Sequence, residues 1–321
     1  MSAGLSNNIS STSVFLLTGF PGLEHLHSWI FVPFCSLYAV AILGNYTILF
    51  VIKTEQDLHQ PMYYFLSMLA TTDLGLALST LPTMLCVFWF NSREISFDAC
   101  LVQMFFIHAF SFMESSVLLA MAFDRFVAIC SPLRYASILT GERCAKVGLV
   151  IVCRCTLLLF PLIGLLTLLP FCRSHVLSHS YCLHQDIIRL ACTDTTLNSM
   201  YGLTLVLLIV ILDPLLIILS YVLILKAVLS IASKAERAKA LNTCVSHICA
   251  VLIFYIPMVG LSMIHRFGKD TAPVIHILMA NIYLFVPPVL NPIIYSIKTK
   301  QIRKGVLRLL CQKRASPGHH L

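Results

Sequence analysis

The chain has 321 residues, of which 58% are hydrophobic and only 11% are charged. Soluble globular domains carry about a quarter charged residues, so this composition excludes an ordinary soluble domain and indicates a membrane protein. The formal net charge of +8 is expected from a basic face near anionic lipid, and nucleic acid is not needed to explain it.

The hydrophobic residues gather into seven runs, each long enough to cross about 30 Å of hydrocarbon as a helix. These runs cover residues 28–52, 61–88, 98–130, 143–169, 198–229, 240–264 and 273–296. The sequence lacks the alternation of polar and apolar residues that is typical of a membrane β-barrel. It therefore predicts an all-α membrane protein with an N-terminal segment at 1–27, a seven-transmembrane bundle at 28–296 and a tail at 297–321.

Basic residues are distributed unevenly between the two ends of these helices. With the N-terminus outside, 16 of the 22 Lys and Arg residues lie on the cytoplasmic side, five lie outside, and Arg154 lies within a helix. This excess predicts a multi-pass plasma-membrane protein with an extracellular N-terminus. Residues 1–27 contain neither a basic n-region nor a short apolar h-region, so we expect no cleaved signal peptide.

Two Asn-X-Ser/Thr triplets occur near the N-terminus. The triplet that begins at Asn8 lies on the expected extracellular side and is a predicted glycosylation site. The triplet that begins at Asn45 lies in the middle of the first helix, where no transferase reaches. Gly44 and Asn45 are instead expected to provide a close contact and a polar tether between helices.

Two carboxylates are expected near the middle of the membrane. Asp73 lies about 18 Å along the second helix from Pro61, and Glu114 lies about 21 Å along the third helix from Cys100. They would repel each other if both were ionised. They are therefore expected to share a cation such as sodium, to share a proton, or each to stay neutral in a hydrogen bond to a neighbouring helix.

Other polar and helix-breaking residues also fall inside the later helices. Arg154 and Asp213 are predicted either to mark a path for ions or to tether helices to each other. Prolines are expected to bend or loosen the helices that contain them, because each removes a backbone hydrogen bond. These prolines are Pro214, Pro257, Pro287 and Pro288.

Four of the 13 cysteines are expected on the oxidising side: Cys100, Cys172, Cys182 and Cys192. Four cysteines allow three disulfide connectivities, and their spacing does not choose among them. The other nine are expected to be small apolar fillers, and they show no zinc-binding spacing.

Three motifs at the cytoplasmic ends of the helices carry a family resemblance. Residues 121–135 read MAFDRFVAICSPLRY, residues 239–257 begin KALNTCVSH, and residues 291–295 read NPIIY. The first resembles the end of the third helix in rhodopsin-like G-protein-coupled receptors and the MAYDRYVAICxPLxY signature of olfactory receptors. The others are similar to the KAxxTCxSH element of olfactory receptors and the NPxxY motif. Phe123 and Phe126 replace two tyrosines of the signature, which removes two hydroxyls near Arg125.

The resemblance implies several features of the bundle. It selects the disulfides Cys100–Cys182 and Cys172–Cys192, and it implies a sodium pocket at Asp73 with Glu114 as an addition. It also implies that an agonist frees Arg125 and opens a cleft for a stimulatory olfactory G protein that raises cAMP. The residues expected to act in this coupling are Asp124, Arg125, Tyr221, Lys239, Tyr255, Asn291, Pro292 and Tyr295.

Polar side chains are also expected near the outer third of the bundle: His108, Ser111, His184, Gln185, Ser262 and Arg266. They are expected above an apolar cavity lined by Leu205, Val206, Ile209 and Leu284. A planar arginine with nearby donors suits a carboxylate, because bidentate charge-assisted bonds are strong. In the competing interpretation, Arg266 extends to the membrane surface and the histidines cap loops. The segments FPGLEHLHSW and MIHRFG resemble class I, fish-like olfactory receptors, which implies carboxylic acid ligands.

The segment after the seventh helix predicts an amphipathic helix on the inner leaflet, with Cys311 as a candidate acylation site. Its apolar face contains Ile302, Val306, Leu309 and Leu310, flanked by Lys300, Arg303, Lys304 and Arg308.

Three other classes of protein fit the sequence less well. An ion or proton transporter that uses the buried charges is the first alternative, but no internal repeat supports it. A retinal-binding photoreceptor is disfavoured because the seventh helix has no lysine before Lys298. No phosphate loop, metalloprotease helix or nucleophile motif indicates an enzyme.

Overall fold

The computed structural model describes residues 14–20, 22, 27–172, 175–267 and 272–315, with the backbone alone described at 27–28, 266–267, 273 and 310–315. Within these residues, seven helical segments are long and apolar enough to cross a membrane. The spanning segments are α1 (His27–Thr54), α2 (Pro61–Phe88), α3 (Phe97–Cys130), α5 (Gly141–Thr167), α7 (Thr196–Leu207) continued by η4 (Leu208–Leu212) and α8 (Asp213–Leu229), α9 (Lys234–Phe267) and α10 (Pro273–Lys298). The predicted seven-helix membrane fold is confirmed. The glycosylation site predicted at Asn8 lies outside the described residues.

Short elements connect the long helices. They are η2 (Gln56–Leu58), η3 (Pro132–Arg134), α4 (Tyr135–Ile138) and α6 (His184–Arg189). Helix starts follow from local sequence. Pro61 occupies the first turn of α2, where its missing N–H is not needed. Ser96 and Thr140 cap α3 and α5, each accepting a hydrogen bond of 3.3 Å from a backbone N–H in the first turn.

Two helices differ most from the expectation. The prediction began the sixth span at residue 240, but α9 begins at Lys234, because the charged segment before residue 240 consists of good helix formers. A run of apolar residues predicts only the part of a helix that lies in the lipid, so a helix can begin before the run. In the fifth span, η4 is a π-helical segment directly before Asp213 and Pro214. Pro214 cannot donate to the preceding turn, so the expected loosening occurs there.

A small three-stranded sheet closes one end of the bundle and was not predicted. Its strands β1 (Val14–Leu17), β2 (Glu94–Ser96) and β3 (Val176–Leu177) lie in the order β2-β1-β3. Strand β1 pairs antiparallel with β2 and parallel with β3. Phe15 is fully buried and packs edge-on against the rings of Phe97 and Phe171. The chain before α1 is thus bound to two distant loops.

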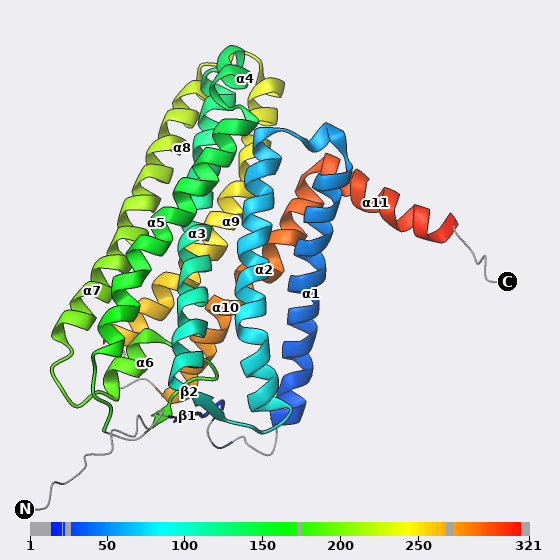
Figure 1. Ribbon diagram of the computed structural model, residues 1–321. Coiled ribbons are helices and arrows are strands. Elements are labelled where there is room, and N and C mark those ends of the chain that lie inside the picture. The colour runs from blue at the N-terminus through cyan, green and yellow to red at the C-terminus, as the bar shows by residue number, and fades with distance from the viewer. Residues whose placement is uncertain (1–13, 21, 23–26, 173–174, 268–271, 316–321) are drawn as a thin grey trace, which may run out of the picture.

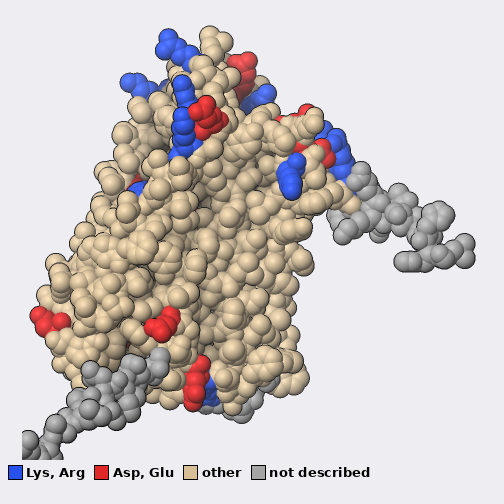
Figure 2. Space-filling model, in the orientation of Figure 1, with Lys and Arg blue, Asp and Glu red and all other residues tan. Residues whose placement is uncertain are grey.

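The opposite end of the bundle carries α4 and the start of α11 (Lys300–Ala315), which projects sideways from the bundle (Figure 1). Ile302 of α11 is fully buried, and Arg308 forms a salt bridge of 2.6 Å with Glu55. The side chains of Leu310 and Cys311 lie outside the described residues. In the view of Figure 2, Lys and Arg side chains gather at this end, while few appear at the sheet end.

Within the bundle, α1 and α10 make the close contact that Gly44 and Asn45 predict. A Cβ atom on Gly44 would lie 3.0 Å from Pro292, and the amide of Asn45 donates to the carbonyl of Pro288 at 2.9 Å. A larger residue at position 44 would push the two helices apart.

Candidate functional site

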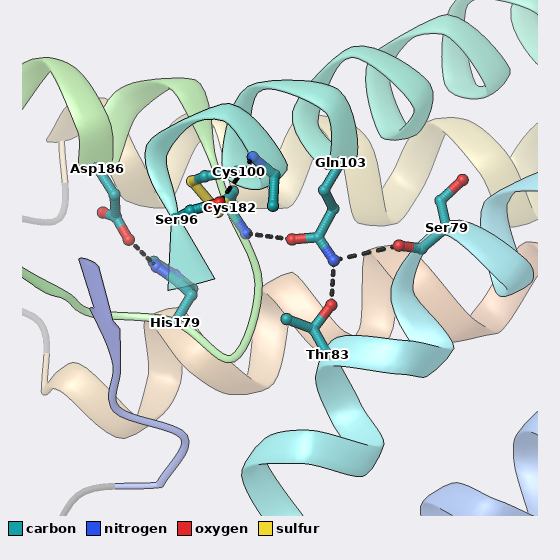
Figure 3. Close-up of a disulfide and its surroundings, with 9 residues drawn as sticks. Ser79, Thr83, Ser96, Cys100, Gln103, His179, Cys182 and Asp186 are labelled. Carbon is teal, nitrogen blue, oxygen red and sulfur yellow. Dashed lines mark hydrogen bonds and ion pairs between the residues drawn. A yellow bond between two sulfur atoms is a disulfide. The ribbon is translucent and has the colours of Figure 1, made fainter. Parts of the chain in front are cut away.

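Two disulfides, Cys100–Cys182 and Cys172–Cys192, hold the segment between α5 and α7 at the sheet end of the bundle. Both are the pairings that the family resemblance implies. Beside the first disulfide, the side-chain oxygen of Gln103 accepts a hydrogen bond of 3.0 Å from the backbone N–H of Cys182. The amide nitrogen of Gln103 donates to the carbonyl of Ser79 at 3.1 Å and to the hydroxyl of Thr83 (Figure 3). These bonds fix the loop to α2 and α3.

The loop and the helices enclose a cavity of about 380 Å³. Its polar lining comes from α3, α6, α7, α9 and α10. The polar and basic residues among the described lining are His108, His184, Gln185, Arg189, Ser199, Ser262, His265 and Tyr283. Apolar side chains fill most of the remaining wall. The cavity is large enough for a small organic molecule.

Four of the six predicted ligand residues line this cavity: His108, His184, Gln185 and Ser262. Ser111 does not lie among the described lining residues. It is buried, and its hydroxyl accepts a hydrogen bond of 2.5 Å from Tyr283, which does line the cavity. The backbone of Arg266 lies in α9 one turn beyond Ser262, and its side chain is outside the described residues.

The expected apolar lining is present at Leu205, Val206 and Ile209. Leu284 is buried but is not among the described lining residues, because Tyr283 is the residue of α10 that faces the cavity. Four other polar residues of the lining were not predicted: Arg189, Ser199, His265 and Tyr283. His265 is three residues beyond Ser262, a spacing that places it on the same side of a helix and gave a usable signal.

His184 is neutral throughout the physiological range. Its burial, followed by the neighbouring His108 imidazole, lowers the pKa of His184 to about 3. A neutral imidazole can share a hydrogen bond with a ligand but supplies no positive charge. The positive charge for an anionic ligand must therefore come from another residue.

The stability of the ligand-free protein is expected to fall as the pH is lowered from 7 to 5. Between about pH 6.5 and pH 3 the unfolded chain protonates His184 and the folded chain does not, so up to about 1.4 kcal/mol per pH unit is lost. The unfolding temperature should fall less steeply in His184→Gln than in the wild type. The exposed His59 provides the control variant His59→Gln, and equal slopes in wild type and His184→Gln would contradict the assignment.

The two membrane carboxylates converge on one side chain of α10. The amide nitrogen of Asn291 donates to Asp73 at 3.0 Å and to Glu114 at 3.3 Å. Both acidic residues are buried, at 0% and 1% exposure. Among the described atoms, Asp73 Oδ1 and Asn291 Oδ1 are buried and have no hydrogen-bond partner. The second, third and seventh spans thus meet in a pocket of oxygen atoms.

Arg154 and Asp213 form a salt bridge of 3.2 Å between α5 and α8, which confirms the tether interpretation. Asp213 also accepts a hydrogen bond of 2.7 Å from Ser115 of α3. The Ser115 hydroxyl lies 2.8 Å from the hydroxyl of Tyr255 on α9. Arg154 donates a further bond of 3.1 Å to Ser116. One connected polar network therefore joins four spanning segments.

The end of the bundle opposite the sheet contains the predicted coupling residues Asp124 and Arg125 of α3 and Tyr221 of α8. Arg125 forms a salt bridge of 3.1 Å with Asp124, which also accepts a hydrogen bond of 2.7 Å from Tyr135. The hydroxyl of Tyr221 lies 2.7 Å from Nδ1 of His247, whose Nε2 donates to a backbone carbonyl of α3 at 2.9 Å. These bonds link the third, fifth and sixth spans.

The other predicted coupling residues occupy different environments. Lys239 is exposed on α9, and Pro292 is buried against α1. Tyr255 is buried in the network around Asp213, while Asn291 holds the two carboxylates. Tyr295 is buried, and its hydroxyl has no hydrogen-bond partner among the described residues.

Comparison with known proteins gives a consistent result. A family model described as olfactory receptor matches residues 34–313. Human olfactory receptor 51G2 is 61% identical over 308 residues, which cover 96% of this chain and 98% of the relative. Human olfactory receptor 51Q1 is 60% identical over 309 residues, with 96% and 98% coverage. Human olfactory receptor 51L1 is 57% identical over 309 residues, again with 96% and 98% coverage.

Proposed function

The chain belongs to the olfactory receptor family, whose members are odorant-sensing G-protein-coupled receptors, and from this premise we propose its ligand class and its coupling. The protein binds small carboxylic acids in the cavity between the loop and the bundle. It then activates a stimulatory, olfactory-type G protein that raises cAMP. It is not an enzyme.

The observation that carries the ligand proposal is the convergence of His108, His184, Gln185 and Ser262 on one small cavity. These side chains supply hydrogen bonds, and Arg266 supplies the charge from the next turn of α9. Charge-assisted bonds to a carboxylate contribute roughly 1.5–3 kcal/mol each. A ligand with about six heavy atoms has a ceiling near 9 kcal/mol, so micromolar or weaker affinity is expected.

The proposed orientation places the sheet, the disulfides and the N-terminus outside the cell. The gathering of basic side chains at the α4 end in Figure 2 supports this orientation, because cytoplasmic segments are enriched in Lys and Arg. Agonist binding then favours a state in which α9 moves away from α3 at the cytoplasmic end. Only a higher affinity for that state can shift the equilibrium. Release of Arg125 opens the cleft for the G protein.

Sodium is proposed to bind at Asp73 and Glu114 in the resting state. The buried, unpartnered oxygens of Asp73 and Asn291 support this assignment, since oxygen ligands suit hard cations. The competing arrangement is a pair of neutral carboxyl groups held by hydrogen bonds alone.

Replacing choline by sodium at constant ionic strength should lower apparent agonist affinity at least about fivefold in the wild type. Glu114→Gln keeps the side-chain shape but removes one charge from the pocket, so this dependence should disappear. Agonist displacement on purified protein measures the apparent affinity of the wild type and of Glu114→Gln. A sodium response in Glu114→Gln equal to that of the wild type would exclude the shared site.

The proposed function is tested by nucleotide exchange with purified components. The receptor in nanodiscs is combined with the olfactory heterotrimer and a series of acids, alcohols and esters of matched chain length. Acids are expected to accelerate exchange, and matched alcohols to be weaker. Proteoliposomes that contain only this protein are tested for ion flux. Flux without any ligand-dependent exchange would favour the transporter alternative.

A further inference from the structure

Three ionisable side chains meet beside the cavity that is proposed to bind the odorant, and the proposed ligand binding does not use them. They are His179 of the loop, Asp186 of α6 and His265 near the end of α9, and their candidate ligand atoms all lie within 4.8 Å of one another. His179 and Asp186 are 2% and 3% exposed, and His265 is half-buried. Figure 3 shows His179 and Asp186 side by side, close to the first disulfide.

Hydrogen bonds fix the roles of the ring nitrogens on the two histidines. Nδ1 of His265 lies 2.9 Å from the carbonyl of Leu261, which can only accept, so Nδ1 carries the proton. Nε2 of His265 is buried and has no hydrogen-bond partner among the described residues, so it is the nitrogen available to a cation. Nδ1 of His179 contacts the carboxylate of Asp186, and a cation held by both groups takes the place of the proton between them. Metal-binding histidines characteristically use one nitrogen for the metal and donate from the other to a carbonyl or carboxylate.

The carboxylate of Asp186 supplies the charge. Oδ1 of Asp186 is buried and has no hydrogen-bond partner among the described residues. Arg189 stands 4.0 Å from that oxygen, beyond hydrogen-bond distance, and its side chain is 57% exposed. The guanidinium is therefore free to turn into solvent.

We propose that His179, Asp186 and His265 form a binding site for a divalent cation of the zinc class. Two imidazoles and one carboxylate are a recurring zinc ligand set, with water in the fourth position. Zinc–ligand distances of about 2.0–2.1 Å place tetrahedral ligand atoms about 3.3 Å apart. One ligand atom from each of the three side chains already lies within 4.8 Å of the others, so side-chain adjustments bring the set to this spacing.

The site connects two parts of the molecule that face the odorant. His179 and Asp186 belong to the loop segment that follows α5, whereas His265 belongs to α9 and lines the cavity. A bound cation fastens the loop to the outer part of α9. It also stabilises the folded protein, because the unfolded chain does not hold the three ligands together.

Binding is measured on full-length, chelator-treated receptor in nanodiscs by zinc titration against a chromophoric indicator. The wild type should bind one zinc ion at this site with micromolar or tighter affinity and unfold at a higher temperature with zinc. Millimolar magnesium or calcium should not displace the zinc, because these ions prefer all-oxygen sites. His265→Asn and Asp186→Asn should each weaken binding at least tenfold, whereas the exposed loop control His175→Asn should bind as the wild type does.

Cobalt spectroscopy on the wild type provides a second measurement that does not depend on the folding of a variant. Cobalt at this site should give the visible bands of a tetrahedral nitrogen and oxygen environment. A sulfur-to-cobalt charge-transfer band would place the ion on a free cysteine and overturn the assignment. Zinc affinity unchanged in both His265→Asn and Asp186→Asn would also overturn it. These readouts involve no G protein, so they are independent of the proposed function.

Discussion

Arg266→Ala is expected to abolish responses to short-chain carboxylic acids while leaving the receptor at the cell surface. The cavity needs a positive charge for an acid, and His184 is neutral because burial lowers its pKa to about 3. Loss of two charge-assisted bonds at roughly 1.5 kcal/mol each corresponds to about a 100-fold loss of potency. Concentration–response curves in a cAMP assay, with surface labelling of the same cells, measure both quantities.

Arg189 provides the matched control because it is the arginine among the described cavity residues. Its guanidinium lies near Asp186 and its side chain is largely exposed, so Arg189→Ala should change acid potency much less. Arg266→Lys should retain part of the response, since lysine keeps the charge but loses the planar fork. Unchanged acid potency in Arg266→Ala would remove the arginine from the ligand site.

The membrane architecture could be predicted because it depends on properties that are local in the sequence. Seven apolar runs correspond to the seven spanning segments, and their ends differ mainly where a helix extends beyond the lipid, as α9 does at Lys234. The small sheet was missed because β3 has only two residues and pairs with a strand far away in the sequence. No local pattern identifies such a pairing.

Most residues of the candidate site could be predicted from the sequence, but the contacts between them could not. Helical spacing brought His108 and Ser262 to the cavity, but the same reasoning placed Ser111 at its surface, where Tyr283 covers it. The charges of Arg154 and Asp213 were visible, but their mutual contact depends on how α5 packs against α8. The cluster around His265 depends on the fold of a loop, and spacing along the chain does not reveal it.

Asp213→Asn is expected to destabilise the receptor strongly, by about 3 kcal/mol or more, because it removes the partner of Arg154. Asp213 is 1% exposed, and 33% of the Arg154 side chain is exposed on the bundle surface, which faces lipid in the membrane. An unpaired arginine there must extend to the headgroups or draw in water. The variant should unfold several degrees below the wild type in nanodiscs, and its ligand response should weaken with it.

The double variant Arg154→Met with Asp213→Leu separates the charge effect from loss of the network. It leaves no unpaired charge, so it should be closer to the wild type in unfolding temperature than Asp213→Asn is. Ser115 keeps Tyr255 as a hydrogen-bond partner after the carboxylate is removed, so its hydroxyl is not left unsatisfied. A double variant less stable than Asp213→Asn would show that the network, and not charge pairing, is the main source of stability. The network also joins α9 to α3 through Tyr255 and Ser115, so the double variant should show altered basal nucleotide exchange. If Arg154 and Asp213 act only as a tether between α5 and α8, basal exchange would be unchanged.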